Sequence, residues 1–393
     1  MSATLIIKSQ GARSLWRGHP WLYAQTVKRI VGKGRAGQVV RLEDETGRFL
    51  AWAWYSPESH IRARVLERDP TVEVDWAWLE ARLERAAAKR EGLAAGGLDA
   101  YRLVNAESDG LPGLIVDRLG PGLVLQALSA GAETVKRQVA DWLVGRFGPE
   151  WVWERSDQPV RKLEGLEPWQ GPLHGTDPGR VVISEGDCRF WVEPAGGQKT
   201  GFYLDQRENR RLVGELAAGR RVLDCFTYSG GFAMRALLAG AERATLVDSS
   251  AGALALARDN LALNGLEGRA DLVRANVFEL LRDYRDQGRC FDLIVLDPPK
   301  LAPTRAAVEK ATRAYKDLNL MALRVLAPDG VLATFSCSAG MDRERFWEVL
   351  TWAAEDARLG LQVVKVLGQP ADHPVLLGFP ESQYLKGLVL RPL

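Results

Sequence analysis

Cys337 is the residue with the clearest capacity for covalent chemistry. It stands between Ser336 and Ser338, directly after an apolar run at 331–335 that predicts a strand. A thiolate at a strand exit can add to C6 of a pyrimidine, which turns C5 into an enamine-like carbon able to accept an alkyl group. A cysteine in a buried strand is more often a small apolar side chain. The flanking serines at the strand exit favour the nucleophile over that alternative.

An acid and two prolines end another apolar run. Residues 291–296 predict a buried strand, and Asp297, Pro298, Pro299 and Lys300 follow it directly. Because prolines cannot extend a strand, they turn the chain and direct the acid and the next carbonyl group outward. We expect a planar substrate to contact Pro298 and Lys300, and Asp297 to serve both catalysis and cofactor binding. The alternative is a turn that only ends the strand.

The stretch 221–250 predicts a site for a nucleoside-containing cofactor. A strand at 222–225, a loop with two glycines and a helix lead to a second strand that stops at Asp248. Glycine lets the backbone approach a ligand closely, and an acid in this place binds the two ribose hydroxyls. The loop lacks the G-x-G-x-x-G spacing, so NAD and FAD are disfavoured. The loop residues expected to contact the cofactor are Phe226, Tyr228, Gly230 and Gly231.

A dense polar loop at 196–210 comes directly before this stretch. Its side chains offer donors and acceptors for a zwitterionic amino-acid group, and a helix N-terminus there attracts a carboxylate. A capped helix with surface charges explains 207–210 but not 198–203. The residues expected to bind the cofactor here are Thr200, Gly201, Tyr203 and Gln206.

Alternating apolar strands and helices after residue 181 predict an α/β fold with an open, Rossmann-like parallel sheet. In such a sheet, ligands bind outside the carboxyl ends of the strands. Polar residues fall at or just beyond five of these ends, namely Asp224, Asp248, Asn276, Asp297 and Cys337. The repeated placement predicts one site along this edge.

Residues 1–70 predict a β domain that binds a polyanion. They carry twelve Lys and Arg against six Asp and Glu, whereas the rest of the chain carries 40 against 44. Runs rich in aromatic and β-branched residues are separated by turn signals. Arg17 and Trp21 lie where basic and aromatic side chains alternate, which suits phosphate contact and base stacking. The alternatives are a solvated charged surface and tryptophans that only pack the domain.

Residues 71–180 predict a small α+β middle domain, and 181–393 form the third and largest domain. Helical spacing at 72–93 is followed by strand and turn patterns. Glu107 and Asp109 lie in a turn, where they would either bind a base edge or only stabilise the loop. An apolar edge expected on the middle domain would suit a homodimer.

Composition disfavours several classes of protein. The 393 residues suffice for two or three domains. No apolar run approaches the roughly 20 residues of a membrane helix, and the N-terminus lacks the pattern of a secretory signal. The widely spaced cysteines contain no C-x-x-C pair, so we expect no metal site. They are Cys188, Cys225, Cys290 and Cys337. Widely spaced cysteines without a pairing pattern are typical of a reducing compartment, so we expect a cytoplasmic protein.

Six motifs that span the chain are typical of one family. In order, the chain contains R-L-V-N-A-E-S-D-G-L-P-G-L, G-Q-K-T-G-F-Y-L-D-Q-R-E-N-R, D-x-F-x-Y-x-G-G-F, L-D-P-P-K, S-C-S and D-H-P-V…F-P-E-S-Q-Y-L-K-G. Together they resemble the bacterial PUA-domain-containing, class I S-adenosylmethionine (SAM)-dependent large-subunit ribosomal RNA cytosine-C5 methyltransferases. The resemblance implies SAM as methyl donor and a PUA barrel that docks RNA. It further implies that Cys337 is the nucleophile in forming 5-methylcytosine in 23S ribosomal RNA.

Two positions depart from the family pattern. Asn276 replaces the usual Asp at the adenine edge, although an amide can still donate and accept. Lys300 stands where two-cysteine RNA cytosine methyltransferases carry their second cysteine, so the acceptor of the C5 proton is open. His373 is one candidate, and a structural loop histidine is the alternative.

Three other functions remain open. Uridine-C5 methyltransferases use similar cysteine chemistry but usually follow the cysteine with Asn-Pro, whereas Ser338 and Ala339 follow Cys337. Methylation of a base nitrogen would leave Cys337 structural. A SAM-binding RNA assembly factor would bind RNA without methyl transfer. All of these functions imply RNA as partner, with neither membrane nor metal.

Overall fold

The computed structural model describes residues 3–301, 308–338 and 340–393. The chain divides into two compact units. The first comprises Met1–Ser184, Val192–Leu204 and Ala371–Ser382, and the second Glu185–Trp191, Asp205–Pro370 and Gln383–Leu393. Buried hydrophobic clusters form within each unit.

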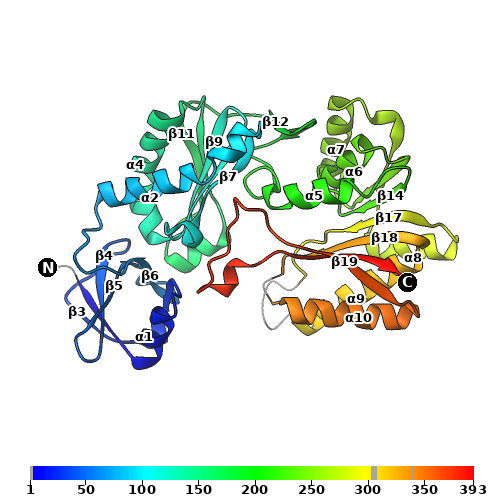
Figure 1. The fold of residues 1–393 in the computed structure, drawn as a ribbon. Helices are drawn as coiled ribbons and strands as arrows, with labels where there is room; N and C mark the ends of the chain where they lie inside the picture. Colours follow the sequence, from blue (N-terminus) through cyan, green and yellow to red (C-terminus); the bar gives the residue numbers. More distant parts are fainter. Residues whose placement is uncertain (1–2, 302–307, 339) are drawn as a thin grey trace. The chain divides into compact units, whose positions relative to one another are not determined.

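The N-terminal part of the first unit, in blue in Figure 1, contains a β-sheet. This sheet has six strands in the order β2-β6-β5-β4-β1-β3. Its strands are β1 (Thr4–Ile7), β2 (Trp21–Tyr23), β3 (Val27–Val31), β4 (Val39–Asp44), β5 (Phe49–Tyr55) and β6 (Ile61–Glu67), with helix α1 (Ser9–Trp16). The small core is mostly aliphatic and includes Leu5, Leu22, Val40 and Leu42. The tryptophans differ in burial. Trp54 is buried and packs inside the protein, whereas Trp16 is 56% exposed.

The rest of the first unit is built on a five-stranded sheet with the order β11-β10-β9-β8-β7. Its strands are β7 (Ala100–Asn105), β8 (Leu114–Leu119), β9 (Gly122–Ala127), β10 (Val152–Ser156) and β11 (Trp169–His174). Helices α2 (Trp76–Ala88) and α4 (Ala130–Phe147) pack on it, and α3 (Glu91–Ala95) follows α2. Asp75 caps α2 and Ser129 caps α4, and each side chain accepts a hydrogen bond from a backbone N–H in the first turn of its helix.

The second unit contains the α/β sheet expected from the sequence. Its seven strands have the order β16-β15-β14-β17-β18-β20-β19. They are β14 (Arg221–Cys225), β15 (Arg243–Asp248), β16 (Ala270–Arg274), β17 (Phe291–Leu296), β18 (Leu326–Ser336), β19 (Leu361–Leu367) and β20 (Lys386–Pro392). The first five in the order are parallel, and β20 is antiparallel to both neighbours. The strand order reverses between β14 and β17, which is where such sheets bind ligands.

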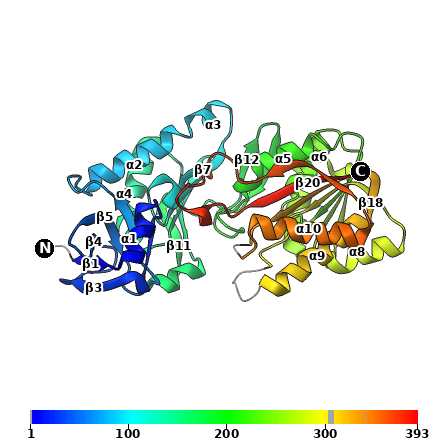
Figure 2. The same ribbon diagram turned by 60° about the horizontal axis from the view of Figure 1, so that its bottom comes forward.

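Helices cover both faces of this sheet (Figures 1 and 2). Helices α5 (Arg207–Gly214), α6 (Gly231–Leu238) and α7 (Ala251–Leu263) lie on one side, and α8 (Val277–Asp286), α9 (Val308–Arg324) and α10 (Arg343–Ala357) on the other. Part of the helix expected at 305–326 lies outside the described residues. Strands β12 (Val181–Glu185) and β13 (Cys188–Val192) form the expected hairpin. None of the helices within the described ranges is long and apolar enough to cross a membrane.

Candidate active site at the carboxyl edge of the second sheet

Five parallel strands end side by side along one edge of the second unit's sheet. Asp248 is the last residue of β15, whereas Asp297 and Cys337 directly follow β17 and β18. Asp224 is the penultimate residue of β14, and Asn276 comes two residues after β16. This edge therefore gathers the five polar positions selected from the sequence.

The loop between β14 and α6 has an unusual backbone. Phe226 and Tyr228 have positive φ angles of 61° and 47°, which residues other than glycine rarely adopt. Backbone bonds fix the turn, because the N–H of Thr227 donates to Val247 O at 3.0 Å and that of Gly230 to Thr227 O at 2.8 Å. Such strain costs about 1–3 kcal/mol per residue and is common at ligand sites.

Two buried polar side chains hold this loop. The Asp224 carboxylate is 1% exposed and accepts hydrogen bonds from the Thr227 hydroxyl at 2.6 Å and the Ala233 N–H at 3.1 Å. Burial raises the pKa of Asp224 to about 6, although these hydrogen bonds oppose the rise. Asn260 of α7, which sequence reasoning missed, donates to the Ser229 carbonyl at 3.0 Å. Both side chains stabilise the loop from inside the protein.

The two loop glycines are required by internal packing. Gly230 has a φ of 80°, and a Cβ there would lie 2.5 Å from Cε of Met234. A Cβ on Gly231 would lie 2.8 Å from Cδ of Arg210. Arg210 is itself buried and donates to Glu185 at 3.0 Å, so it has little freedom to move away. Any larger side chain at either position would disturb the loop.

Asp248 and Asn276 are oriented by backbone N–H groups. Asp248 accepts from Tyr228 at 3.0 Å through Oδ2 and from Ser250 at 2.9 Å through Oδ1. Each carboxylate oxygen has a second lone pair, so the pair can also accept from two vicinal hydroxyls. Asn276 is exposed and caps α8, because its Oδ1 accepts from the Phe278 N–H at 3.0 Å. That leaves the Nδ2 hydrogens for another acceptor.

Asp297 is anchored by a chain of amide side chains. Gln206 donates through Nε2 to Asp297 Oδ2 at 2.9 Å, and its Oε1 accepts from Asn209 Nδ2 at 2.6 Å. Asn209 also donates to the Gly368 carbonyl at 2.9 Å. Gln206 thus has a partner in the acid at the end of β17. Asn209 was not predicted, and its only sequence signal is the spacing of three from Gln206 at the start of α5.

Cys337 is half-buried beside the Asp-Pro-Pro turn, with Sγ 4.0 Å from the Pro298 carbonyl oxygen. The two serines that flank it hydrogen-bond Tyr315 of α9, whose hydroxyl lies 3.0 Å from Ser336 Oγ and 3.1 Å from Ser338 Oγ. Burial raises the pKa of the Tyr315 hydroxyl. This phenol was not predicted, because nothing in the sequence near the cysteine indicates it.

Lys386 completes the surroundings of the cysteine. It begins β20, is 5% exposed, and donates from Nζ to the Ser338 carbonyl oxygen at 2.8 Å. Burial lowers its pKa to about 8, while the neighbouring Cys337 and Asp342 oppose that shift. Its sole sequence signal is membership of the C-terminal Y-L-K-G motif.

Comparisons with known proteins identify the family of this chain. A family model described as S-adenosylmethionine-dependent methyltransferase matches residues 171–380, and a PUA-like domain model matches 5–68. A Klebsiella pneumoniae (strain 342) protein named "Ribosomal RNA large subunit methyltransferase I" is 45% identical over 98% of both chains. The protein of that name from Escherichia coli (strain K12) is 43% identical over 100% of both.

This chain belongs to the S-adenosylmethionine-dependent methyltransferases. The resemblance inferred from the motifs is thereby confirmed, with an N-terminal PUA-like domain, and SAM is the cofactor. Two solved structures show the same fold over 100% of both chains, each with 22% identity. One is a candidate SAM-dependent methyltransferase from Streptococcus mutans, with a TM-score of 0.85, and the other is a candidate methyltransferase in complex with SAH, with a TM-score of 0.87. The α/β class is likewise confirmed.

The edge at β14 and β15 of the methyltransferase fits SAM. The Asp248 carboxylate presents its free lone pairs beyond the strand end, as a ribose requires. The strained loop beside it brings the backbone of Phe226 to Gly230 to the same edge. Phe226 and Phe278 contact each other with ring centroids 6.4 Å apart, which provides apolar surface there. Among the described residues, no cluster of His, Cys, Asp and Glu suits a metal ion.

Three residues predicted to bind the cofactor belong to the first unit of the methyltransferase. Thr200 is buried and its hydroxyl donates to Asp117 of β8 at 2.6 Å. The Tyr203 hydroxyl donates to the side-chain carbonyl of Gln198 at 2.5 Å. Gly201 has a φ of 118° and packs on the backbone of Glu193 and Pro194. These contacts give each residue a structural role, and SAM contact by them stays a prediction.

The residues predicted to bind RNA have mixed surroundings. The Trp21 indole donates to Glu107 at 2.8 Å, and Asp109 is buried with Arg90, whose Nη2 lies 2.7 Å from Oδ2 of the acid. Loop stabilisation, the alternative for these two acids, therefore accounts for their contacts. Arg17 and Lys300 are exposed, whereas Pro298 is buried.

His373 belongs to a buried segment of the first unit. It is 1% exposed, and its Nδ1 lies 3.5 Å from Oδ1 of Asp372. Asp372 accepts from the Arg102 N–H at 2.9 Å, and its carbonyl accepts from Arg90 at 2.9 Å. These contacts favour the structural loop histidine over a proton acceptor.

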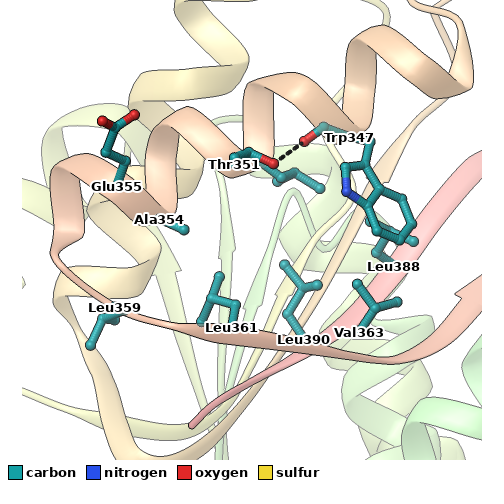
Figure 3. Close-up of a pocket in the computed structure, with 10 residues that line it drawn as sticks. Trp347, Thr351, Ala354, Glu355, Leu359, Leu361, Val363, Leu388 and Leu390 are labelled. Atoms are coloured by element: carbon teal, nitrogen blue, oxygen red, sulfur yellow. Dashed lines mark hydrogen bonds between the residues drawn. The ribbon is translucent and has the colours of Figure 1, made fainter.

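An apolar groove of about 440 Å³ lies between α10, β19 and β20 of the second unit (Figure 3). Trp347 borders it together with Leu361, Val363, Leu388 and Leu390. None of the residues predicted from the sequence lines it. Its lining residues are mostly apolar and come from α10, β19, β20 and the connection between α10 and β19, so the groove is separate from the chemistry described above.

Proposed function

We propose that this methyltransferase transfers the methyl group of SAM to C5 of a cytosine in 23S ribosomal RNA of the large subunit, with Cys337 as covalent nucleophile. Relatives that match nearly the whole chain at 43–45% identity bear the name of ribosomal RNA large subunit methyltransferases. The observation that carries the chemistry is the Cys337 thiol beside the Asp-Pro-Pro turn, 4.0 Å from the Pro298 carbonyl oxygen. A thiol there can reach the same planar base as Asp297.

The covalent steps follow from the weak nucleophilicity of C5. The Cys337 thiolate adds to C6, and C5 becomes an enamine-like carbon. SAM supplies an electrophilic methyl group bonded to a sulfonium sulfur. C5 takes the methyl group as the bond from that methyl group to sulfur breaks and a neutral thioether leaves. A base then takes the C5 proton, and expulsion of the thiolate restores the C5–C6 double bond. Asp297, held by Gln206 at 2.9 Å, binds N3 or the exocyclic amine and favours the charge that addition requires.

The cofactor residues retain the roles predicted for them. In the proposal Asp248 binds the ribose hydroxyls, Asn276 contacts the adenine edge through Nδ2, and Phe226 and Tyr228 provide apolar surface. Gly230 and Gly231 keep the loop open to the ligand, while Asp297 meets both SAM and the base. Thr200, Gly201, Tyr203 and Gln206 were predicted for the methionine end. The bond between Gln206 and Asp297 supports a position beside SAM.

RNA docking is proposed for the PUA-like domain together with the cysteine edge. Exposed Arg17 offers a phosphate contact, and half-buried Trp21 offers an aromatic surface. Exposed Lys300 follows the Asp-Pro-Pro turn and suits a phosphate of the target nucleotide, with Pro298 packing behind it. We further propose a division at 1–70, 71–180 and 181–393, a cytoplasmic location where ribosomes are made, and a homodimer.

Methyl transfer to unmodified 23S ribosomal RNA tests the proposal. Purified wild-type protein, Cys337→Ala and Cys290→Ala are incubated with labelled SAM and the RNA, and the labelled nucleoside is identified after digestion. We expect 5-methylcytosine with wild type and Cys290→Ala, and a loss of roughly 10⁴-fold with Cys337→Ala, as for removal of other covalent nucleophiles. Cys290 is the matched control because it is half-buried in the same unit.

Each of the other outcomes contradicts a defined part of the proposal. Label that persists with Cys337→Ala would exclude the covalent mechanism and indicate methylation of a base nitrogen. Label recovered as 5-methyluridine would show that the substrate base is uridine and not cytosine. Absence of label with wild type, despite SAM and RNA binding, would indicate the non-catalytic assembly factor.

A further inference from the structure

Lys386 is a buried cation whose side chain reaches the turn that carries the cysteine. It lies opposite Ser336 in the antiparallel pair of β18 and β20, so the two side chains share a face of the sheet. Its Nζ donates to the Ser338 carbonyl oxygen at 2.8 Å, one residue beyond Cys337. Lysine is seldom buried without a function for its charge, and the covalent steps above do not use it.

The charged and titratable groups near this lysine lie at the start of α10 and at the end of β18. Asp342 caps α10, Arg343 is the first residue of that helix and lines a small cavity together with Lys386, and Cys337 directly follows β18. The electrostatic neighbours that favour the charged form of Lys386 are Cys337 and Asp342. Tyr315 is bonded to the two serines rather than to the lysine. Of these groups, the acid and the thiol therefore favour the ammonium form.

We propose that Lys386 is a positioning residue that fixes the turn at Cys337 and stabilises the thiolate through its positive charge. The inference rests on the proposed nucleophilic role of Cys337. A nearby cation favours thiolate over thiol, and the thiol proton passes to solvent. Lys386 forms no covalent bond in the reaction. Its hydrogen bond to the Ser338 carbonyl keeps the cation beside the sulfur while the base enters and leaves.

The pH dependence of alkylation tests this role without RNA or SAM. Wild type and Lys386→Met are treated with iodoacetamide between pH 5.5 and 10, and the rate at Cys337 is read from its peptide by mass spectrometry. We expect the midpoint to rise by about one pH unit, hence roughly ten-fold slower alkylation near neutral pH. Cys290 in the same samples is the internal standard. Lys365→Met removes an exposed lysine from β19 and should leave both midpoints unchanged.

A second measurement separates charge from structure. Single-turnover methyl transfer by Lys386→Met should fall about ten-fold at pH 7 and recover as the pH rises, because thiolate then forms without the cation. A loss equal at every pH would overturn the proposal, as would an unchanged alkylation midpoint in a variant that binds SAM normally. Lys386→Arg retains the charge and should keep the wild-type midpoint.

The wild-type protein provides a test even where Lys386→Met does not fold. The proposal requires the Cys337 midpoint to lie below that of Cys290, and an equal or higher midpoint would overturn it. Failure of the proposed function is a separate result. Methyl transfer that survives Cys337→Ala would remove the nucleophile, yet the alkylation shift caused by Lys386→Met would still be seen.

Discussion

The two ends of the candidate site are built by different means. At the cofactor end (Asp224, residues 226–231 and Asp248), backbone N–H groups orient Asp248, and they come from residues 20 positions away or fewer. At the nucleophile end (Gln206, Asp297, Tyr315, Cys337 and Lys386), side chains make the contacts. Gln206 lies 91 positions from Asp297, and Lys386 lies 48 positions from Ser338.

This difference indicates which properties each end can vary. A backbone N–H keeps its position whatever the side chain, so the cofactor end depends on the loop conformation and on one carboxylate. The nucleophile end is a partly buried network in which each charge affects the others, since electrostatic interactions are stronger away from water. We therefore expect substitutions at the cofactor end to change SAM affinity or stability, and those at the nucleophile end to change the rate.

The largest expected effect at the cofactor end concerns stability and pH. The pKa of Asp224 is raised from 3.8 to about 6, so the folded state binds this proton more tightly than the unfolded state does. The stability that this tighter proton binding gives the folded state is fully present below about pH 4, and it is lost as the pH rises through about 6. Two pKa units correspond to about 3 kcal/mol. Relative to wild type, Asp224→Asn should gain about this free energy of unfolding between pH 4 and 7.

Urea unfolding at pH 4, 5.5 and 7 measures this difference. Asp292→Asn is the matched control, because its Arg221 partner lowers the pKa of Asp292 and the difference should change with the opposite sign. A pH-independent difference for Asp224→Asn would show that the buried acid does not titrate in this range.

Asp248→Asn should weaken SAM binding about 100-fold. One acceptor oxygen becomes an NH₂ group, which cannot accept from both a backbone N–H and a ribose hydroxyl, and hydrogen bonds to a charged group contribute about 1.5–3 kcal/mol. Calorimetric titration with SAM measures the loss. Asp271→Asn, on the half-buried neighbouring strand β16, should leave the affinity within two-fold. An Asp248→Asn affinity equal to wild type would remove Asp248 from the cofactor site.

Gln206→Ala distinguishes the two ends most directly, because Gln206 was predicted as a cofactor ligand and contacts Asp297 in the structure. If its main role is to hold Asp297, the maximal rate should fall about ten-fold while SAM affinity stays within two-fold, as expected for one lost hydrogen bond to a charged group. Gln362→Ala on exposed β19 is the control. A fall in SAM affinity with an unchanged maximal rate would place Gln206 at the cofactor end.

The same contrast explains what the sequence could predict. The parallel sheet and the strand ends that carry the candidate cofactor residues were predictable, because strand, loop and acid follow one another within 221–250 and local periodicity reports them. The partners of Cys337 were not, since Tyr315 comes from α9 and Lys386 from β20, and spacing along the chain does not report contacts between distant segments. The loop at 196–210 shows the converse limit. Its polar residues are adjacent in sequence, yet Thr200 belongs to the first unit and Gln206 to the second.

The smallest expected effect separates two roles of Asn276. Its Oδ1 caps α8, and the proposal assigns its Nδ2 to adenine. Asn276→Ser keeps a good cap but removes the amide hydrogens, whereas Asn276→Ala removes both and should destabilise the protein by about 1 kcal/mol. We expect SAM affinity to fall roughly five-fold in both variants, as expected for one neutral hydrogen bond, while only Asn276→Ala lowers the melting temperature. Wild-type affinity in Asn276→Ser would restrict Asn276 to capping, and recognition of the adenine edge would then fall to the backbone at the start of α8.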